Sequence, residues 1–202
     1  MARFGTCTLL VALLVSLAGP APAADTRGLF SVKGVGTADC QRYLNARKEG
    51  GREYFVFAGY LGGYLTAHNQ LSEATFDIVP WQTIDTIAGM MSSFCAKNPT
   101  ANFAVAVTRL VKFLEPERLA VGSETVEAKV GTSGVTIYRE TLRRAQMKLA
   151  EAGHYRGTPD GQFTPVTRAA LEKFQSAKGL PKTGLPDQVT LLRLLLTQEV
   201  PR

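Results

Sequence analysis

The sequence predicts an all-α protein made of two small helical domains. Apolar residues recur at helical spacing over most of residues 37–118 and again over residues 137–196. Capping residues and prolines precede these stretches, and glycines or prolines follow them. Between them, residues 121–136 mix Gly, Ser, Thr and Glu without a sustained period, which favours a flexible linker. We therefore expect a four-helix domain within residues 24–120, the linker, and a three-helix domain over residues 137–202.

The first 23 residues have the features of a secretory signal peptide. Arg3 supplies a positive start, residues 9–17 form an apolar run too short to span a bilayer, and Ala21-Pro22-Ala23 offers a cleavage site. An uncleaved N-terminal anchor is the alternative. We expect a periplasmic or secreted protein that has no membrane segment after signal cleavage. Nucleic acid is a poor partner for an exported chain, although the net charge is +6.

Two cysteines, Cys40 and Cys95, remain after removal of the predicted signal peptide. An even number of cysteines in an exported chain indicates a disulfide bond, because the bacterial periplasm is oxidising. Two buried free thiols are the alternative. A Cys40–Cys95 bond would join the first predicted helix to the third. We expect no zinc site, because the only histidines, His68 and His154, lie at no ligand spacing from a cysteine.

The helices of the first half are predicted from their flanking residues. Thr37 and Thr100 are expected to cap the first and fourth helices, and Pro80 to open the third at its first position. The second helix, over residues 54–71, contains three glycines. Each costs about 1 kcal/mol relative to alanine inside a helix. This predicts either close packing against a neighbouring helix or a break.

The second half carries clearer helix signals, centred on the sequence Asp-Gly-Gln-Phe-Thr-Pro-Val-Thr at residues 160–167. Asp-Gly predicts a tight turn, and Thr164-Pro165 predicts a helix start with a hydroxyl cap and proline at the first position. Gly179 is expected to end this helix. Residues 161–171 align without gaps to residues 184–194, with Gly, Val, Thr and Leu coinciding. This indicates either an internal repeat or two generic helix starts.

These residues resemble the small peptidoglycan-binding domain that is appended to many bacterial cell-wall hydrolases. The matching segments are Gln146-Met-Lys-Leu149, Gly153-His154-Tyr155, Asp160 to Thr167, Ala170-Leu171-Glu-Lys-Phe174-Gln175, Gly179-Leu180, Thr183-Gly184 and Asp187 to Leu191. The sequence departs at Thr164, where the family usually has glycine, a change that a capping threonine tolerates. The resemblance implies a three-helix domain that binds peptidoglycan in a shallow groove beside the Asp-Gly turn and the following helix.

The resemblance gives five candidate binding residues, which are Tyr155, Asp160, Phe163, Thr167 and Gln175. Three of them have a structural alternative: Asp160 holding the turn, Phe163 packing in the core, and Thr167 bonding locally near the helix start.

The basic excess of the chain lies in residues 137–202, where Arg139 with Arg143 and Arg144 with Lys148 form i,i+4 pairs. Such a face either attracts the stem-peptide carboxylates of peptidoglycan or is simply solvated.

Residues 37–118 resemble, more distantly, small helical periplasmic proteins with one disulfide. These are the HdeA-type acid-stress chaperones and the immunity proteins that neutralise secreted amidase effectors. The matching segments are Thr37-Ala-Asp-Cys40, Tyr43-Leu44, Ala58-Gly-Tyr-Leu-Gly-Gly63 and Cys95-Ala-Lys-Asn98-Pro99, with Phe103 and Ala106-Val107. The resemblance implies a domain that interacts with another periplasmic protein.

A catalytic constellation cannot be assembled from the sequence. Two isolated histidines do not supply a three-ligand metal set, disulfide-bonded cysteines cannot act as nucleophiles, and no Gly-x-Ser-x-Gly motif is present. A two-carboxylate glycosidase stays open, because its acids need only converge in space. We expect a wall-associated, non-catalytic protein without metal or cofactor that binds peptidoglycan and a protein partner. A wall-localised chaperone, an amidase inhibitor and a cryptic wall hydrolase are the alternatives.

Overall fold

The structure, a computed structural model, describes residues 25, 27 and 29–196. The predicted signal peptide lies outside the described residues. Residues Met1–Val32 and Lys33–Arg202 form two separate units, and the elements below all belong to the second. Within the described part of the chain, no helix is both long enough and apolar enough to cross a membrane.

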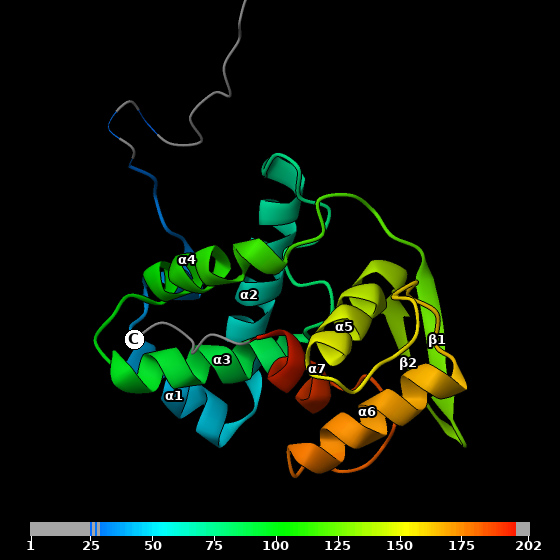
Figure 1. The fold of residues 1–202 in the computed structure, drawn as a ribbon. Helices are drawn as coiled ribbons and strands as arrows, with labels where there is room; N and C mark the ends of the chain where they lie inside the picture. The colour runs from blue at the N-terminus through cyan, green and yellow to red at the C-terminus, as the bar shows by residue number, and fades with distance from the viewer. Residues whose placement is uncertain (1–24, 26, 28, 197–202) are drawn as a thin grey trace, which may run out of the picture. The chain divides into compact units, whose positions relative to one another are not determined.

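Four α-helices build the first half of the chain (Figure 1). They are α1 (Cys40–Glu49), α2 (Arg52–Leu71), α3 (Ile84–Lys97) and α4 (Phe103–Leu114), with 3-10 turns η1 (Gly34–Thr37) before α1 and η2 (Glu115–Glu117) after α4. Their apolar faces share one core, in which the rings of Tyr43, Phe57 and Phe103 lie 4.8 to 5.4 Å apart. Tyr43 donates its hydroxyl to the carbonyl of Ala88 at 2.6 Å, so this buried polar group is satisfied.

A disulfide bond joins Cys40 to Cys95, as predicted. Cys40 is the first residue of α1 and Cys95 lies near the end of α3, and both are fully buried in the first core. The two cysteines are 55 residues apart in the sequence. In the chain-entropy account, closing a loop of this length destabilises the unfolded chain by about 4 kcal/mol. The bond therefore stabilises the arrangement of α1 against α3.

Reduction of the disulfide is expected to lower the free energy of unfolding by about 4 kcal/mol. Urea unfolding followed by circular dichroism, with and without reductant, measures this difference. A Cys40→Ala/Cys95→Ala variant should match the reduced protein. Alkylation of either cysteine in native, non-reduced protein would contradict the assignment.

Two helices of the first half begin later than predicted. Asp39 caps α1 in place of Thr37, and Asn102 caps α4 in place of Thr100. The two capping residues pair with each other in an isolated antiparallel β-bridge. Each cap is itself local: Asp39 accepts from the backbone N–H of Arg42 at 2.8 Å, and Asn102 accepts from that of Ala104 at 3.0 Å. The sequence thus offers two capping residues near each helix start, and the bridge brings the two that are used together.

The third helix also begins later than predicted. Thr83 is the N-cap of α3 and accepts from the backbone N–H of Thr86 at 3.2 Å, whereas Pro80 lies in the preceding loop. That loop carries Trp81 away from the first core. Trp81 is 8% exposed and packs in the core of the second half. The proline therefore belongs to a connection between the two halves.

The second helix, α2, is continuous despite its three glycines. A Cβ placed at Gly59 or Gly63 would meet nothing within 4 Å, and one at Gly62 would come no closer than 3.8 Å to Ile84. The predicted break is absent. Close packing against another helix of the chain does not explain why residues 59 and 63 are glycines, because a larger side chain would fit at both positions.

Residues 121–136, predicted to be a flexible linker, contain most of a β-hairpin. The strands β1 (Thr125–Val130) and β2 (Ser133–Tyr138) pair in antiparallel register around a two-residue turn. Gly131 opens this turn with φ +59°, a conformation that glycine adopts readily. The expectation of an irregular segment is therefore wrong. The protein is mostly helical with a small two-stranded sheet, and it is not strictly all-α.

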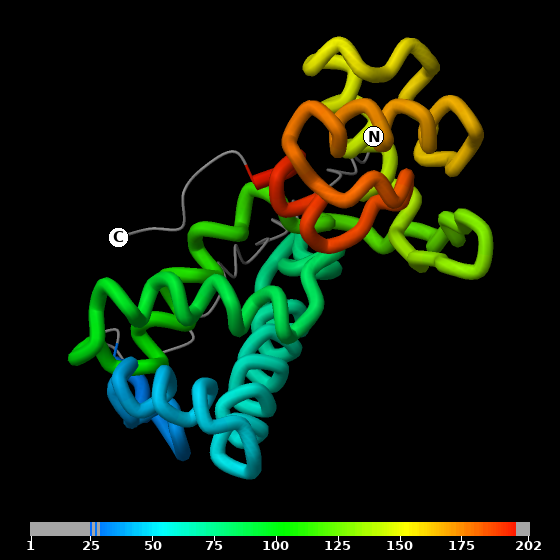
Figure 2. Tube along the Cα trace, turned by 90° about the horizontal axis from the view of Figure 1, so that it is seen from below, coloured from blue at the N-terminus to red at the C-terminus, as the bar shows by residue number. Residues whose placement is uncertain are grey.

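The second half consists of this hairpin and three helices, whose path Figure 2 shows. The helices are α5 (Arg139–Glu151), α6 (Pro165–Ala177) and α7 (Gln188–Leu195). Thr164 and Asp187 cap α6 and α7 as predicted, and Gly179 follows α6 with φ +65°. The second core contains Trp81, Ile137, Leu142, Ala145, Leu149, Tyr155, Ala170, Leu171, Phe174, Leu191, Leu194 and Leu195.

Side chains connect the two halves in addition to the hairpin. Gln188, the first residue of α7, donates to the carbonyl of Trp81. Its amide oxygen accepts from the backbone N–H of Thr83 at 3.1 Å and from the hydroxyl of Thr86 at 2.6 Å. The second half is thus bonded to the start of α3, and a residue of the first half completes its core.

Candidate functional site

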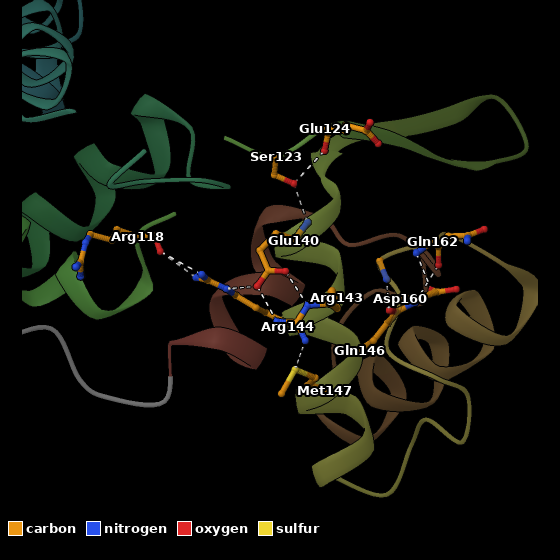
Figure 3. Close-up of polar contacts among 11 residues, drawn as sticks. Arg118, Ser123, Glu124, Glu140, Arg143, Arg144, Gln146, Met147, Asp160 and Gln162 are labelled. Atoms are coloured by element: carbon orange, nitrogen blue, oxygen red, sulfur yellow. Dashed lines mark hydrogen bonds and ion pairs between the residues drawn. The ribbon is translucent and has the colours of Figure 1, made fainter. Parts of the chain in front are cut away.

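A buried glutamine holds the Asp-Gly turn of the second half (Figure 3). Gln146, on α5, accepts from the backbone N–H of Gly161 at 2.7 Å. Its amide nitrogen donates to the carbonyl of Gln162 at 2.9 Å and to the hydroxyl of Thr167 at 3.0 Å. Gly161 has φ +73°, and a Cβ there would collide with the carbonyl oxygen of Arg139. Glycine is therefore required at this turn.

A second buried glutamine holds the loop between α6 and α7 in the same way. Gln175, on α6, accepts from the backbone N–H of Gly184 at 2.9 Å. Its amide nitrogen donates to the carbonyl of Leu185 at 3.1 Å and to the hydroxyl of Thr190 at 2.9 Å. Like Gln146, it is 0% exposed.

The two glutamines show that the second half contains an internal repeat. In the alignment of residues 161–171 with residues 184–194, each partner of Gln146 falls on the corresponding partner of Gln175. The capping residues of the two following helices also coincide. Generic helix starts would not produce the same three bonds to a buried side chain. We refer to each glutamine with its three partners as a glutamine clamp.

Loss of either clamp is expected to destabilise the protein. Gln146→Ala and Gln175→Ala each leave buried donors and acceptors unpaired, so each should lower the free energy of unfolding by about 3 kcal/mol. Gln162→Ala is the matched control, because this side chain is exposed and its removal should change stability by less than about 0.5 kcal/mol. Urea unfolding followed by circular dichroism distinguishes these variants. Equal stability of the three would contradict the structural role of the clamps.

Two of the predicted binding residues lie inside the clamps. Thr167 and Gln175 are 0% exposed, and their polar atoms bond to other parts of the chain. Both therefore have a structural role in the loops that they hold. Tyr155 is also buried, at 7% exposed, and its hydroxyl donates to the carbonyl of Thr158 at 3.0 Å.

The other two predicted residues lie nearer the surface. Asp160 is exposed, and its carboxylate accepts from the backbone N–H of Gln162 at 2.9 Å, which holds the turn. Phe163 is half-buried and packs against the second core. Both have the structural roles named as alternatives in the sequence analysis. A role in binding stays a prediction for all five residues.

A surface groove lies between the turn after α5 and the first half of α6. Its volume is about 500 Å³, and it is lined by Gly153, His154, Arg156, Pro165, Val166, Ala169, Ala170 and Lys173. The lining combines apolar groups from Val166 and Ala169 with basic groups from Arg156 and Lys173. Neither basic residue forms a salt bridge with a residue that the structure describes. The groove therefore offers an apolar surface beside two unpaired cations.

Sequence reasoning missed the residues that line this groove. Val166, Ala169 and Lys173 recur at helical spacing on one side of α6. Arg156 directly follows the Gly-x-Tyr turn. The helical spacing was the available signal, but the matched motif is made largely of turn and core positions. The groove lining mixes matched residues, such as Pro165 and Ala170, with residues between them, such as Lys173.

A smaller hollow of about 230 Å³ lies beside the Asp-Gly turn. It is lined by Lys129, Phe163, Thr164, Pro165 and Arg168, so the two hollows share Pro165. Its two cations are already paired, Lys129 with a glutamate at 2.7 Å and Arg168 with another at 2.8 Å. This hollow has less room and less free charge for a ligand.

Acidic side chains neutralise the basic face predicted on α5. Glu140 accepts from Arg143 at 2.7 Å and from Arg144 at 3.1 Å (Figure 3). The hydrogen bond from Arg143, with a further contribution from Arg144, holds the pKa of Glu140 below its ordinary value of 4.5. Arg144 also donates to the carbonyls of Glu117 at 2.8 Å and Arg118 at 3.2 Å, which links α5 to the end of the first half.

The remaining basic residues of this face are paired as well. Arg139 lies 3.5 Å from Glu124, and Lys148 lies 2.8 Å from Glu151. Helix α5 therefore presents ion pairs and not a free cationic surface. This favours the interpretation of a solvated helix face over that of a carboxylate-binding face.

The contribution of Glu140 to stability is expected to depend on pH. Glu140→Gln should lower the free energy of unfolding at pH 7 by about 1 kcal/mol, because it weakens two partly exposed ion pairs. The folded-state pKa lies below the unfolded one, so the contribution is present above the unfolded pKa and is lost as the pH falls through the folded pKa. The difference between wild type and variant should therefore shrink on acidification below pH 4.5. Urea unfolding over a pH series tests this, with Glu151→Gln as the exposed control.

Within residues 29–196, the structure forms no free-cysteine, Ser-His-carboxylate or metal-ligand arrangement of the kinds considered for wall hydrolases. Cys40 and Cys95 are bonded to each other. The ring of His68 lies 3.2 Å from the hydroxyl of Ser72, but no described carboxylate is hydrogen-bonded to that ring. In the same part of the chain, no group of three or more His, Cys, Asp and Glu residues could hold a metal ion.

The second half matches a known family of domains. Residues 138–194 match the family described as "Putative peptidoglycan binding domain". The match includes both glutamine clamps and the large groove, and it agrees with the resemblance seen in the sequence. Trp81, which completes the core of this half, lies outside the matched residues.

Three proteins of different kinds are similar to part of this chain. "Putative OxPP cycle protein OpcA" of Synechococcus elongatus is 36% identical over 73 residues, which is 36% of this chain and 16% of that protein. "Zinc D-Ala-D-Ala carboxypeptidase" of Streptomyces albus G is 36% identical over 74 residues, which is 34% of this chain and 26% of that protein. A crystal structure of SltB3 from Pseudomonas aeruginosa in complex with NAG-anhNAM-pentapeptide is 26% identical over 53% of this chain and 27% of that chain, with a TM-score of 0.28.

The chain thus spans less than a third of the length of each of these proteins. The similarity to the SltB3 structure is too low to carry an argument about the fold. None of these matches supports the resemblance of residues 37–118 to HdeA-type chaperones.

Proposed function

We propose that this protein binds peptidoglycan through the groove on α6 without catalysing a reaction on it. The observation that carries this proposal is the groove itself, which lies within the residues that match the peptidoglycan-binding family. Peptidoglycan offers a chemical complement to its lining. Stem-peptide carboxylates would pair with Arg156 and Lys173. The methyl groups of lactyl and alanine units would cover Val166 and Ala169.

The surroundings expected for this function are those of the bacterial cell wall. The buried disulfide is suited to an oxidising compartment, which supports a periplasmic or secreted location. The first half, with its own core of four helices, would present a surface to a periplasmic protein while the second half holds the wall. Placing a protein partner at the wall in this way requires binding only and no catalysed reaction.

The proposal should be tested on the predicted mature chain, residues 24–202, and not on the isolated second half. A fragment that begins at residue 137 lacks Trp81 and the partners of Gln188. Its failure to bind would not distinguish a missing site from an incomplete core. Arg143 and Arg144 are also poor positions for a substitution that tests binding. Both form ion pairs with Glu140, and Arg144 also joins α5 to the end of the first half through the carbonyl of Glu117.

Reversal of the two groove charges is expected to weaken binding. Arg156→Glu/Lys173→Glu should lower the affinity for purified sacculi about tenfold, which corresponds to about 1.4 kcal/mol. Lys33→Glu/Lys112→Glu, a pair of exposed substitutions outside the groove that changes the net charge equally, is the matched control and should bind like wild type. Co-sedimentation over a range of sacculus concentrations measures the affinity, and circular dichroism confirms that each variant is folded.

Two results would contradict the proposal. Equal weakening by the control would show that general charge attraction, and not the groove, supplies the binding. A clearing band on a sacculus zymogram would overturn the non-catalytic part and favour a wall hydrolase.

A further inference from the structure

The outward face of α2 carries no charged side chain over most of its length. The exposed residues between its ends are Phe55, Val56, Gly59, Gly63, Thr66, Ala67 and Gln70. Phe55 is 69% exposed and Val56 is 50% exposed. The outer face of a helix in a water-soluble protein is ordinarily polar or charged. Within the part of the chain that the structure describes, this face is therefore a largely apolar surface left exposed.

The glycines of this face leave room for another backbone. A side chain at Gly59 or Gly63 would meet nothing within 4 Å, so neither glycine serves packing within the chain. Each nevertheless costs about 1 kcal/mol in a helix interior. With Ala67 they repeat at every fourth residue and lie on one side of the helix. A second helix can approach this side closely, because no side chain larger than a methyl group separates the two backbones.

Opposite charges stand at the two ends of α2. Arg52 is its first residue, and Glu73 lies two residues beyond its last residue, Leu71; both are exposed. Neither forms a salt bridge with any residue in the described ranges. At 1.5 Å per helical residue they are about 30 Å apart, too far to interact within one chain. In an antiparallel pair of α2 helices centred on Gly63, Arg52 of each copy would lie near Glu73 of the other.

We propose that two copies of this chain associate through the outward faces of α2, antiparallel and related by a two-fold axis near Gly63. A two-fold arrangement places the same surface on both sides of the contact and forms both charge pairs at once. One helix per copy buries less area than the roughly 1,200 Å² of a standard stable interface. The dimer is therefore concentration-dependent. The proposal concerns α2 alone and does not rest on peptidoglycan binding.

Sedimentation velocity of the predicted mature chain, residues 24–202, tests this without any ligand. The mass should rise from one copy to two as the concentration increases. Gly63→Glu should abolish the rise while it maintains or increases the thermal midpoint, because the helix gains propensity and the side chain has room. Val105→Glu is the matched control: it places the same charge on α4 at another exposed apolar residue and should leave the dimer intact.

A charge exchange tests the antiparallel arrangement. Arg52→Glu and Glu73→Arg should each weaken association about fivefold, and the double variant should restore it. Restored association can only come from a charge pair between two copies, because residues 52 and 73 of one chain are too far apart to interact. A chain that stays monomeric at all concentrations, or a dimer that tolerates Gly63→Glu, would overturn the proposal. Failure of the double variant to recover would overturn the antiparallel pairing.

Discussion

The shape of the second half depends on two buried amide side chains. A primary amide accepts and donates at the same time, so one glutamine can satisfy a backbone N–H, a carbonyl and a hydroxyl. It is also neutral, so its burial avoids the large desolvation cost of a charged group. Gln146 and Gln175 use this chemistry to fix two loops against the helices on either side. These bonds hold both ends of α6, which forms one side of the groove, while its apolar residues pack in the second core.

The sequence predicted the fold wherever the determinant was local. Thr164 and Asp187 cap their helices as expected, because a cap depends only on residues a turn away. The hairpin was missed, although Val126, Ala128 and Val130 alternate with polar residues at the period of a strand. Its mixed composition concealed this alternation. Helix starts in the first half were misplaced because Asp39, Thr83 and Asn102 are also good caps, and local signals alone do not choose between neighbouring caps.

The candidate site was less predictable than the fold. A shared motif indicates which residues a domain needs, but not whether they hold the domain together or touch a ligand. Thr167 and Gln175 are fully buried and bonded within the chain, so the structure shows that both hold the domain together. The groove is lined by positions such as Arg156 and Lys173, whose identity the motif does not constrain. Only the burial and the spatial arrangement of the side chains separate these two groups.

The contacts of Trp81, Arg144 and Gln188 also have a mechanical consequence. A flexible linker would stay slack under tension until it was fully extended. Here, a force applied at the groove passes through α5 and α7 directly into η2 and α3, and from α3 through the disulfide into α1. The side-chain contacts between the halves are non-covalent, whereas Cys40 and Cys95 are covalently bonded. We therefore expect a pulling force to break the contacts between the halves before it separates α1 from α3.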